Sequence, residues 1–160
     1  GFVMPLAAGI MQLAAGDQFK VTPLDLMFGY TPAQAFEMIN RYGDAGRAVY
    51  LKIELTADII YPIVSALFYG LLISWLFQRG FKPDSKMQQY NLVVVGQWLF
   101  DLLENISIVS MVGMYPAQPT GLALAAVIFG SMKWIFAVAS ILMVLTGLVM
   151  AIKNGFKKHE

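Results

Sequence analysis

The sequence contains no cysteine and a single histidine, His159. Without cysteine the chain cannot form disulfides, thiolate metal sites or a thiol nucleophile. A single histidine excludes haem ligation by paired histidines and argues against a histidine-based zinc site. The sequence also lacks a Walker loop, a Gly-x-Ser-x-Gly motif and a Ser–His–Asp set, so these common catalytic frameworks are not available.

Charge is also scarce, at 13% of the residues, and the net charge is only +1. Soluble domains average about 25% charged residues. A chain with this balance has no basic field to attract nucleic acid, so we expect no nucleic-acid partner. By contrast, 58% of the 160 residues are hydrophobic. A soluble domain of this size has too much surface for its volume to hide so many, and we therefore expect most side chains to face lipid.

The hydrophobic residues gather in four segments, about 1–16, 50–78, 91–114 and 121–152. A transmembrane helix needs about 20 mostly apolar residues, which the last three segments supply. We interpret the short first segment as a membrane span as well, although it could be the apolar part of a signal peptide. The sequence thus predicts an all-α polytopic membrane protein: a four-transmembrane-helix bundle forming one domain over residues 1–160.

Positive charge is distributed unevenly between the connections. The loop 79–89 carries Arg79, Lys82 and Lys86, the C-terminal tail carries three further lysines, and the connection 115–120 carries none. Lysine and arginine mark the cytoplasmic side of short loops. We expect an integral protein of the plasma or inner membrane, with the C-terminus and the loop 79–89 in the cytoplasm.

The first outer loop contains the signature of a short amphipathic helix. Thr31 and Gln34 form a Thr-x-x-Gln capping box, Pro32 suits the first helical position, and Gly43 suits the end. The predicted apolar face is Ala35, Phe36, Met38 and Ile39. We expect this helix to pack on the bundle or rest among lipid headgroups; the alternative is a gate over an outward-facing cavity.

The next helix is predicted to begin near Asp44, as its cap, and to meet no breaker before Pro62. Proline has no N–H, so the backbone carbonyl of Asp58 loses its usual helical donor. Water or a hydroxyl could take this place in an ordinary kink. Alternatively, the freed carbonyl and the Asp58 carboxylate could bind an ion, as in the broken helices of transporters.

Ionisable residues within the apolar segments are costly, from about 2.5 to more than 10 kcal/mol each, and should face the bundle interior. At about 1.5 Å of rise per residue, Asp58, Asp101, Glu104 and Lys133 fall within roughly 9 Å of one depth. We expect Lys133 to pair with one acid, and Arg47 to pair with Glu54 nearer the outside. The predicted ligand- or ion-binding site is Arg47, Glu54, Asp58, Tyr61, Gln97, Asp101, Glu104, Asn105 and Lys133.

The sequence is compatible with three functions. The first is binding or conduction of a proton, a small cation or a polar small molecule, because buried carboxyl groups can be protonated or hold a cation. A homodimer would then be a plausible partner arrangement, because four spans are few for alternating access. The second is a membrane enzyme acting on a lipid or lipid-linked substrate with carboxylate or divalent-metal chemistry. The third is a structural or accessory subunit with a polar core.

The remaining expectations concern cofactors, the methionines and the glycines. No cofactor is expected, other than a possible divalent cation. The ten methionines are interpreted as packing residues because they show no metal-binding spacing. Glycines within the apolar segments are expected to permit close helix contacts. They are Gly70, Gly96, Gly130 and Gly147.

Overall fold

The structure is a computed structural model that describes residues 3–16 and 20–157. Within these ranges the regular elements are all helices and no strand occurs, so the all-α prediction is confirmed. Three helical segments are long and apolar enough to cross a membrane: Gly43–Gly80, Lys86–Gly113 and Thr120–Gly155. They coincide with the second, third and fourth apolar segments of the sequence.

By its internal packing the chain divides into two compact units. The first consists of the described residues up to Tyr61 together with Asp101–Ser131. The second consists of Pro62–Phe100 together with the described residues from Met132 onward. The boundary falls within three helices, α4 (Ala57–Gly80), α5 (Val93–Gly113) and α6 (Thr120–Lys157). The single domain over 1–160 stays a prediction.

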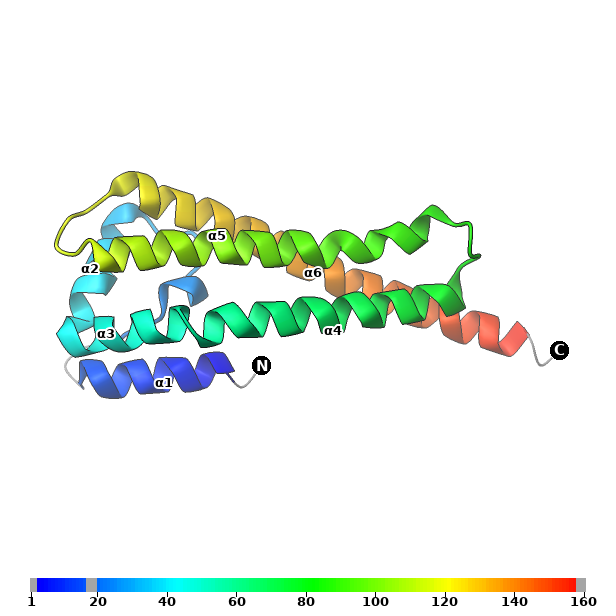
Figure 1. Ribbon diagram of the computed structural model, residues 1–160, viewed down its shortest axis with the longest axis horizontal. Coiled ribbons are helices and arrows are strands. Elements are labelled where there is room, and N and C mark those ends of the chain that lie inside the picture. The colour runs from blue at the N-terminus through cyan, green and yellow to red at the C-terminus, as the bar shows by residue number, and fades with distance from the viewer. Residues whose placement is uncertain (1–2, 17–19, 158–160) are drawn as a thin grey trace. The chain divides into compact units, whose positions relative to one another are not determined.

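Helix α1 (Val3–Ala15) lies along α3 (Gly43–Glu54) in the first unit, as Figure 1 shows. Gly46 lies at this contact, where an added β-carbon would be in ordinary van der Waals contact with the Cβ of Ala15 at 3.6 Å. With 13 residues, α1 is about 20 Å long and shorter than a usual membrane span. Part of the predicted first span, 1–16, lies outside the described residues, and this span stays a prediction.

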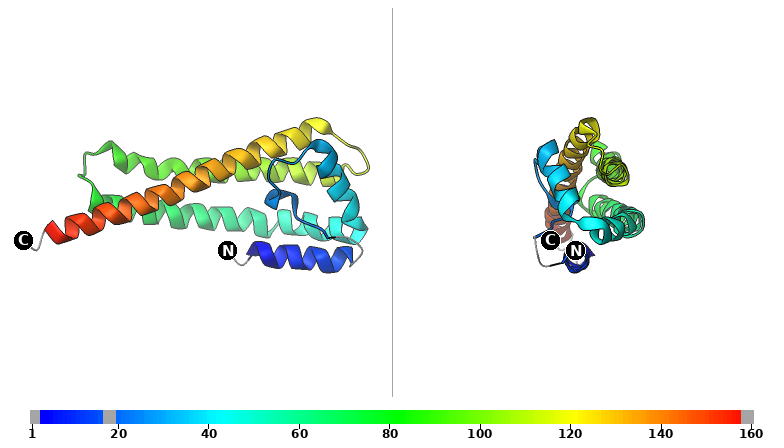
Figure 2. Two further views of the ribbon diagram at one scale, coloured as in Figure 1. Left: turned by 180° about the vertical axis from the view of Figure 1, so that it is seen from behind. Right: turned by 90° about the vertical axis from the view of Figure 1, so that its left-hand side faces the viewer.

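The predicted amphipathic helix is confirmed as α2 (Pro32–Arg41). The Thr31 hydroxyl accepts a hydrogen bond from the Gln34 backbone N–H, and the Gln34 side chain accepts one from the Thr31 N–H, so the capping box is complete. Gly43, with a positive φ of 62°, ends the helix as expected. In Figure 2, α2 crosses the end of the first unit between α3 and the connection from α5 to α6.

The apolar face of α2 joins the core of the first unit. Ala35, Phe36 and Ile39 are buried there, while Met38 is half-buried against it. The rest of this core comes from α1, the segment 20–30, α3, α5 and α6, and it includes the predicted packing methionines Met11 and Met111. The expectation that α2 packs on the bundle therefore agrees with its burial.

Two expectations about the following helix are wrong. The residue before α3 is Tyr42, and Asp44 lies in the first turn without capping it. The helix also breaks before Pro62, because α3 ends at Glu54 and α4 begins at Ala57. The Thr56 hydroxyl donates to the Lys52 carbonyl and competes for that helical acceptor, which explains the interruption.

In the second unit, α4, α5 and α6 pack around Ile73, Phe77 and Val94, and a short 3₁₀ helix, η2 (Lys86–Leu92), precedes α5. The predicted close glycine contacts occur here. A β-carbon on Gly147 would lie 2.8 Å from Leu76 Cβ, one on Gly96 would overlap the Phe136 ring, and one on Gly70 would press on Val94 at 3.3 Å.

Candidate acidic site

Among the described residues of the first unit, four acidic side chains are buried, and they come from three helices. Asp25 lies in the 3₁₀ helix η1 (Leu24–Leu26), Glu54 ends α3, and Asp101 and Glu104 lie one turn apart on α5. Their exposed fractions are 4%, 1%, 8% and 2%, respectively. Such burial of carboxyl groups carries a large desolvation cost, so it needs an explanation.

Asp25 is held against α3 by the hydroxyl of Tyr50. This hydroxyl donates to Oδ1 of Asp25 at 3.0 Å and accepts a hydrogen bond from the Leu24 N–H at 2.9 Å. Asp25 is not among the predicted site residues, because it lies outside the long apolar segments. The signal that could have found it is an aspartate between two leucines, in the triplet Leu24–Leu26 that follows Pro23.

A second tyrosine packs beside Tyr50. The rings of Tyr42 and Tyr50 meet edge to face with centroids 5.2 Å apart, and both side chains are buried. The Tyr42 hydroxyl donates to the Thr22 carbonyl at 2.7 Å, which ties the segment before η1 to the start of α3. Burial raises the pKa of Tyr42 well above its usual value, and the nearby Asp25 adds to this, so Tyr42 remains a neutral donor.

Glu54 is the most buried of the acids and has unusual surroundings. Within the described part of the chain, neither of its carboxylate oxygens accepts a hydrogen bond. The acidic groups that act on it electrostatically are Asp25, Asp58 and Glu104. The Tyr50 hydroxyl is also a hydrogen-bonding neighbour of Glu54, but its direct bond, at 3.0 Å, is donated to Asp25. Glu54 is therefore a buried acid among other acids.

Glu104 packs directly on the backbone of α6 at Gly130. A β-carbon at this position would lie 3.0 Å from Cδ of Glu104, and closer still to its Oε1. A larger residue at 130 would thus occupy the space of the carboxyl group. The prediction that Gly130 permits a close helix contact is confirmed, and what it admits is the acid itself.

A hydrogen bond joins the side chain of Asn105 to the backbone of Asp58. The Asn105 side-chain amide donates to the Asp58 carbonyl at 3.0 Å, and this is the carbonyl that Pro62 deprives of its helical donor. An amide from α5 thus takes the place expected for water or a hydroxyl. The bond satisfies the freed carbonyl without an ion.

A very small cavity adjoins these groups. Its polar lining comes from Asp25, Tyr50 and Asp58, and Met11 and Ile53 are among its apolar walls. Its volume is about 10 Å³. A cavity needs at least about 10–15 Å³ to hold one water molecule, so this space fits one water or a single ion at most.

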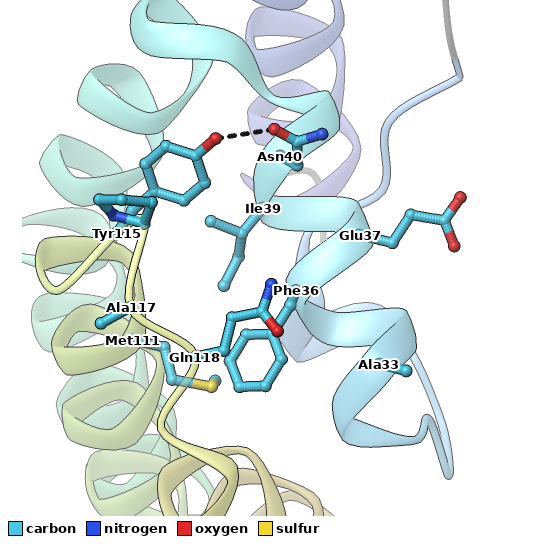
Figure 3. Close-up of a pocket in the computed structure, with 10 residues that line it drawn as sticks. Ala33, Phe36, Glu37, Ile39, Asn40, Met111, Tyr115, Ala117 and Gln118 are labelled. Atoms are coloured by element: carbon cyan, nitrogen blue, oxygen red, sulfur yellow. Dashed lines mark hydrogen bonds between the residues drawn. The ribbon is translucent and has the colours of Figure 1, made fainter.

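A larger cavity of about 400 Å³ lies between α2 and the α5–α6 connection, and Figure 3 shows its lining. Phe36, Ile39 and Met111 form apolar walls, and the Tyr115 hydroxyl donates to Oδ1 of Asn40 at 2.7 Å. Its lining residues include none of the four buried acids. This cavity is therefore separate from the acidic site.

Arg47 contacts two residues that line this cavity, Ile39 and Tyr115, and not the acids of the site. It pairs with Asp44, donates to the Ile39 carbonyl at 3.2 Å, and places its guanidinium 3.8 Å from the centre of the Tyr115 ring. The expected pair with Glu54 is wrong. Asp44, one turn away on α3, is the nearer partner, whereas Glu54 is two turns, or about 10 Å, further along the helix.

The other predicted site residues are distributed between the two units. Glu54, Asp58, Asp101, Glu104 and Asn105 belong to the first unit. Tyr61 also belongs to it but is 37% exposed. The remaining two are in the second unit, namely half-buried Gln97 and buried Lys133. The pairing of Lys133 with an acid stays a prediction.

The described residues offer no arrangement of three or more histidine or acidic side chains that could hold a metal ion. Comparison with protein-family models, with curated proteins and with solved structures found no match.

Proposed function

We propose that this chain is an integral membrane protein whose first unit holds a buried acidic site for a proton or a small cation. The observation that carries the proposal is Glu54, which is 1% exposed and whose carboxylate oxygens accept no hydrogen bond within the described residues. A carboxylate in such a place is costly unless a proton or a cation neutralises it. Neighbouring acids add negative charge and increase the need for a proton or a cation at Glu54.

The size of the adjoining cavity supports a very small ligand. The lining residues of this cavity include Asp25, Tyr50 and Asp58 but not Glu54, and its volume of about 10 Å³ leaves room for one water or one ion. Pockets for organic ligands usually measure about 300–1,000 Å³. Of the three ligand types suggested by the sequence, the polar small molecule is the one this cavity cannot hold.

A membrane location is supported by the three long apolar helices and by their uncovered side chains. On α4, Ile60 is 62% and Leu71 is 70% exposed, and on α6 Val149 is 63% exposed. Isolated exposed apolar residues are common in soluble proteins, but long helices with so many are typical of lipid-facing spans. We propose the orientation given by the positive charges, with the loop 79–89 and the C-terminus in the cytoplasm.

The test uses the purified chain in detergent. Its melting temperature is measured across a pH series, and at fixed pH with NaCl, MgCl₂ or CaCl₂ at matched ionic strength. We expect pH or one of the cations to shift the melting temperature by several degrees, because a ligand at 100 times its Kd stabilises by about 2.7 kcal/mol. Glu54→Gln should lose this response.

Glu37→Gln is the matched control, because Glu37 is an exposed glutamate on α2 that pairs with Arg41. It should respond like the wild type. If Glu54→Gln and the wild type respond alike, the acidic site binds neither ligand, and its acids serve only to hold the helices together.

A further inference from the structure

We infer that the ligand of the acidic site is a proton carried by Glu54, while Asp25 stays ionised and acts as its fixed counterpart. This inference rests on the proposed function and narrows it from a proton or a small cation to a proton. It also assigns different tasks to two acids that the site brings together.

The acidic site lacks the ligands that a divalent metal ion requires. Mg²⁺ requires six oxygen ligands and Ca²⁺ six to eight, in both cases with several from the protein or from ordered water. The described residues provide no suitable group of three acidic or histidine side chains. The cavity of about 10 Å³ also leaves no space for the water molecules that would complete the coordination.

Asp25 and Glu54 differ in their hydrogen bonding. Asp25 receives the proton of the Tyr50 hydroxyl at Oδ1, at 3.0 Å. A hydrogen bond donated to a carboxylate stabilises its charged form. Glu54 is the more buried of the two, and the Tyr50 hydroxyl is also its hydrogen-bonding neighbour. This hydroxyl has one proton, however, and within the described residues its direct bond is to Asp25, while neither oxygen of Glu54 lies within hydrogen-bond distance of a donor. A proton entering the site is therefore held better by Glu54.

The surroundings of Glu54 are strongly acidic. The titratable groups that act on it are Asp25 from η1, Tyr42 before α3, Tyr50 from α3, Asp58 from α4 and Glu104 from α5. Three of these five are carboxylic acids, and each of them in its ionised form adds to the cost of a further negative charge on Glu54.

Infrared spectroscopy of the purified protein in detergent tests the inference directly, because a protonated carboxyl group has a C=O stretch that a carboxylate lacks. We expect this band at neutral pH in the wild type. It should disappear on raising the pH, with release of about one proton per chain. Glu54→Gln should lose both the band and the proton release, whereas Glu37→Gln should keep them.

Tyr50→Phe separates the roles of the two acids. Without the Tyr50 hydroxyl, Asp25 loses its hydrogen-bond donor and competes with Glu54 for the proton. The C=O band of the protonated carboxyl group should then shift towards the frequency of aspartic acid, or divide into an aspartic-acid and a glutamic-acid band. An unchanged band in Tyr50→Phe would overturn the assignment of Asp25 as the fixed anion. If Glu54→Gln does not fold, wild-type protein grown with ¹³C-labelled glutamate gives the same answer. The C=O band must shift relative to unlabelled protein, which assigns it to a glutamate. The band must also persist in Glu37→Gln and Glu104→Gln.

The outcomes also separate this inference from the proposed function. Suppose that no protonated carboxyl is found and that Na⁺, Mg²⁺ or Ca²⁺ raises the melting temperature of the wild type but not of Glu54→Gln. The site then binds a cation, so the proton assignment fails and the proposed function stands. If neither pH nor any cation acts through Glu54, both fail.

Discussion

The Asn105 side-chain amide donates to the backbone carbonyl of Asp58 at 3.0 Å, across 47 residues of sequence. This carbonyl precedes Pro62 by four positions and has no helical donor. The bond therefore replaces the helical hydrogen bond that Pro62 removes from α4. It connects the first turn of α4 to the middle of α5 beside the acidic site.

Replacing Asn105 with alanine should leave the Asp58 carbonyl without its donor. We expect the free energy of unfolding to fall by about 1–2 kcal/mol, a range set by unsatisfied buried groups and by polar pairs in membrane proteins. Denaturant unfolding in mild detergent measures this. Ser110→Ala is the control, since the Ser110 hydroxyl bonds only to the Ile106 carbonyl of its own helix. Equal losses in both variants would contradict the role given to Asn105.

Gly130→Ala should disturb the acidic site through Glu104. The new methyl group would occupy the space of the carboxyl group, with Cδ at 3.0 Å, and overpacking of this kind costs about 1–3 kcal/mol. Thermal unfolding should show a lower melting temperature. Gly121→Ala on the same helix has no atom within 4 Å of the added carbon and should be neutral. If Gly130→Ala is as stable as Gly121→Ala, Glu104 is free to move away.

Arg47→Gln should loosen α2. The substitution removes the stacking on Tyr115 and weakens the bond to the Ile39 carbonyl. A loss of about 1–2 kcal/mol corresponds to roughly five- to thirtyfold faster local opening. Hydrogen exchange of residues 32–41, followed by mass spectrometry, reports this opening. Lys52→Gln, an exposed change on the same helix, should leave the exchange unaltered; matching rates in the two variants would show that Arg47 does not hold α2.

Stability should decline at high pH because of Tyr42. Burial holds the pKa of Tyr42 well above 10.0 in the folded chain, whereas the unfolded chain ionises near 10. The contribution is complete below the unfolded value and is lost as the pH rises through the folded one. Tyr42→Phe should thus be less stable by about 1 kcal/mol at neutral pH, but lose less stability between pH 9 and 11.

Unfolding at a series of pH values provides this comparison. Tyr61→Phe is the control, because Tyr61 is 37% exposed and should behave as the wild type. The same loss of stability above pH 10 in Tyr42→Phe and in the wild type would show that another group causes the decline.

The sequence by itself determined the elements whose causes are local. The capping box of Thr31 and Gln34 and the stop at Gly43 define α2 through contacts within four residues, and long apolar runs define the three helices that could cross a membrane. Proline at 62 likewise identified the carbonyl that needs a partner. Such features could be read directly, because each depends on neighbouring positions or on composition alone.

Only the tertiary structure decided which groups meet. Asp25 reaches Tyr50 across 25 residues, and Asn105, not water, satisfies Asp58. Arg47 turns to Asp44 and Tyr115 instead of Glu54. Burial and partner choice depend on which distant segments cover a side chain, and a periodic pattern in one helix carries no information about the residues packed against it.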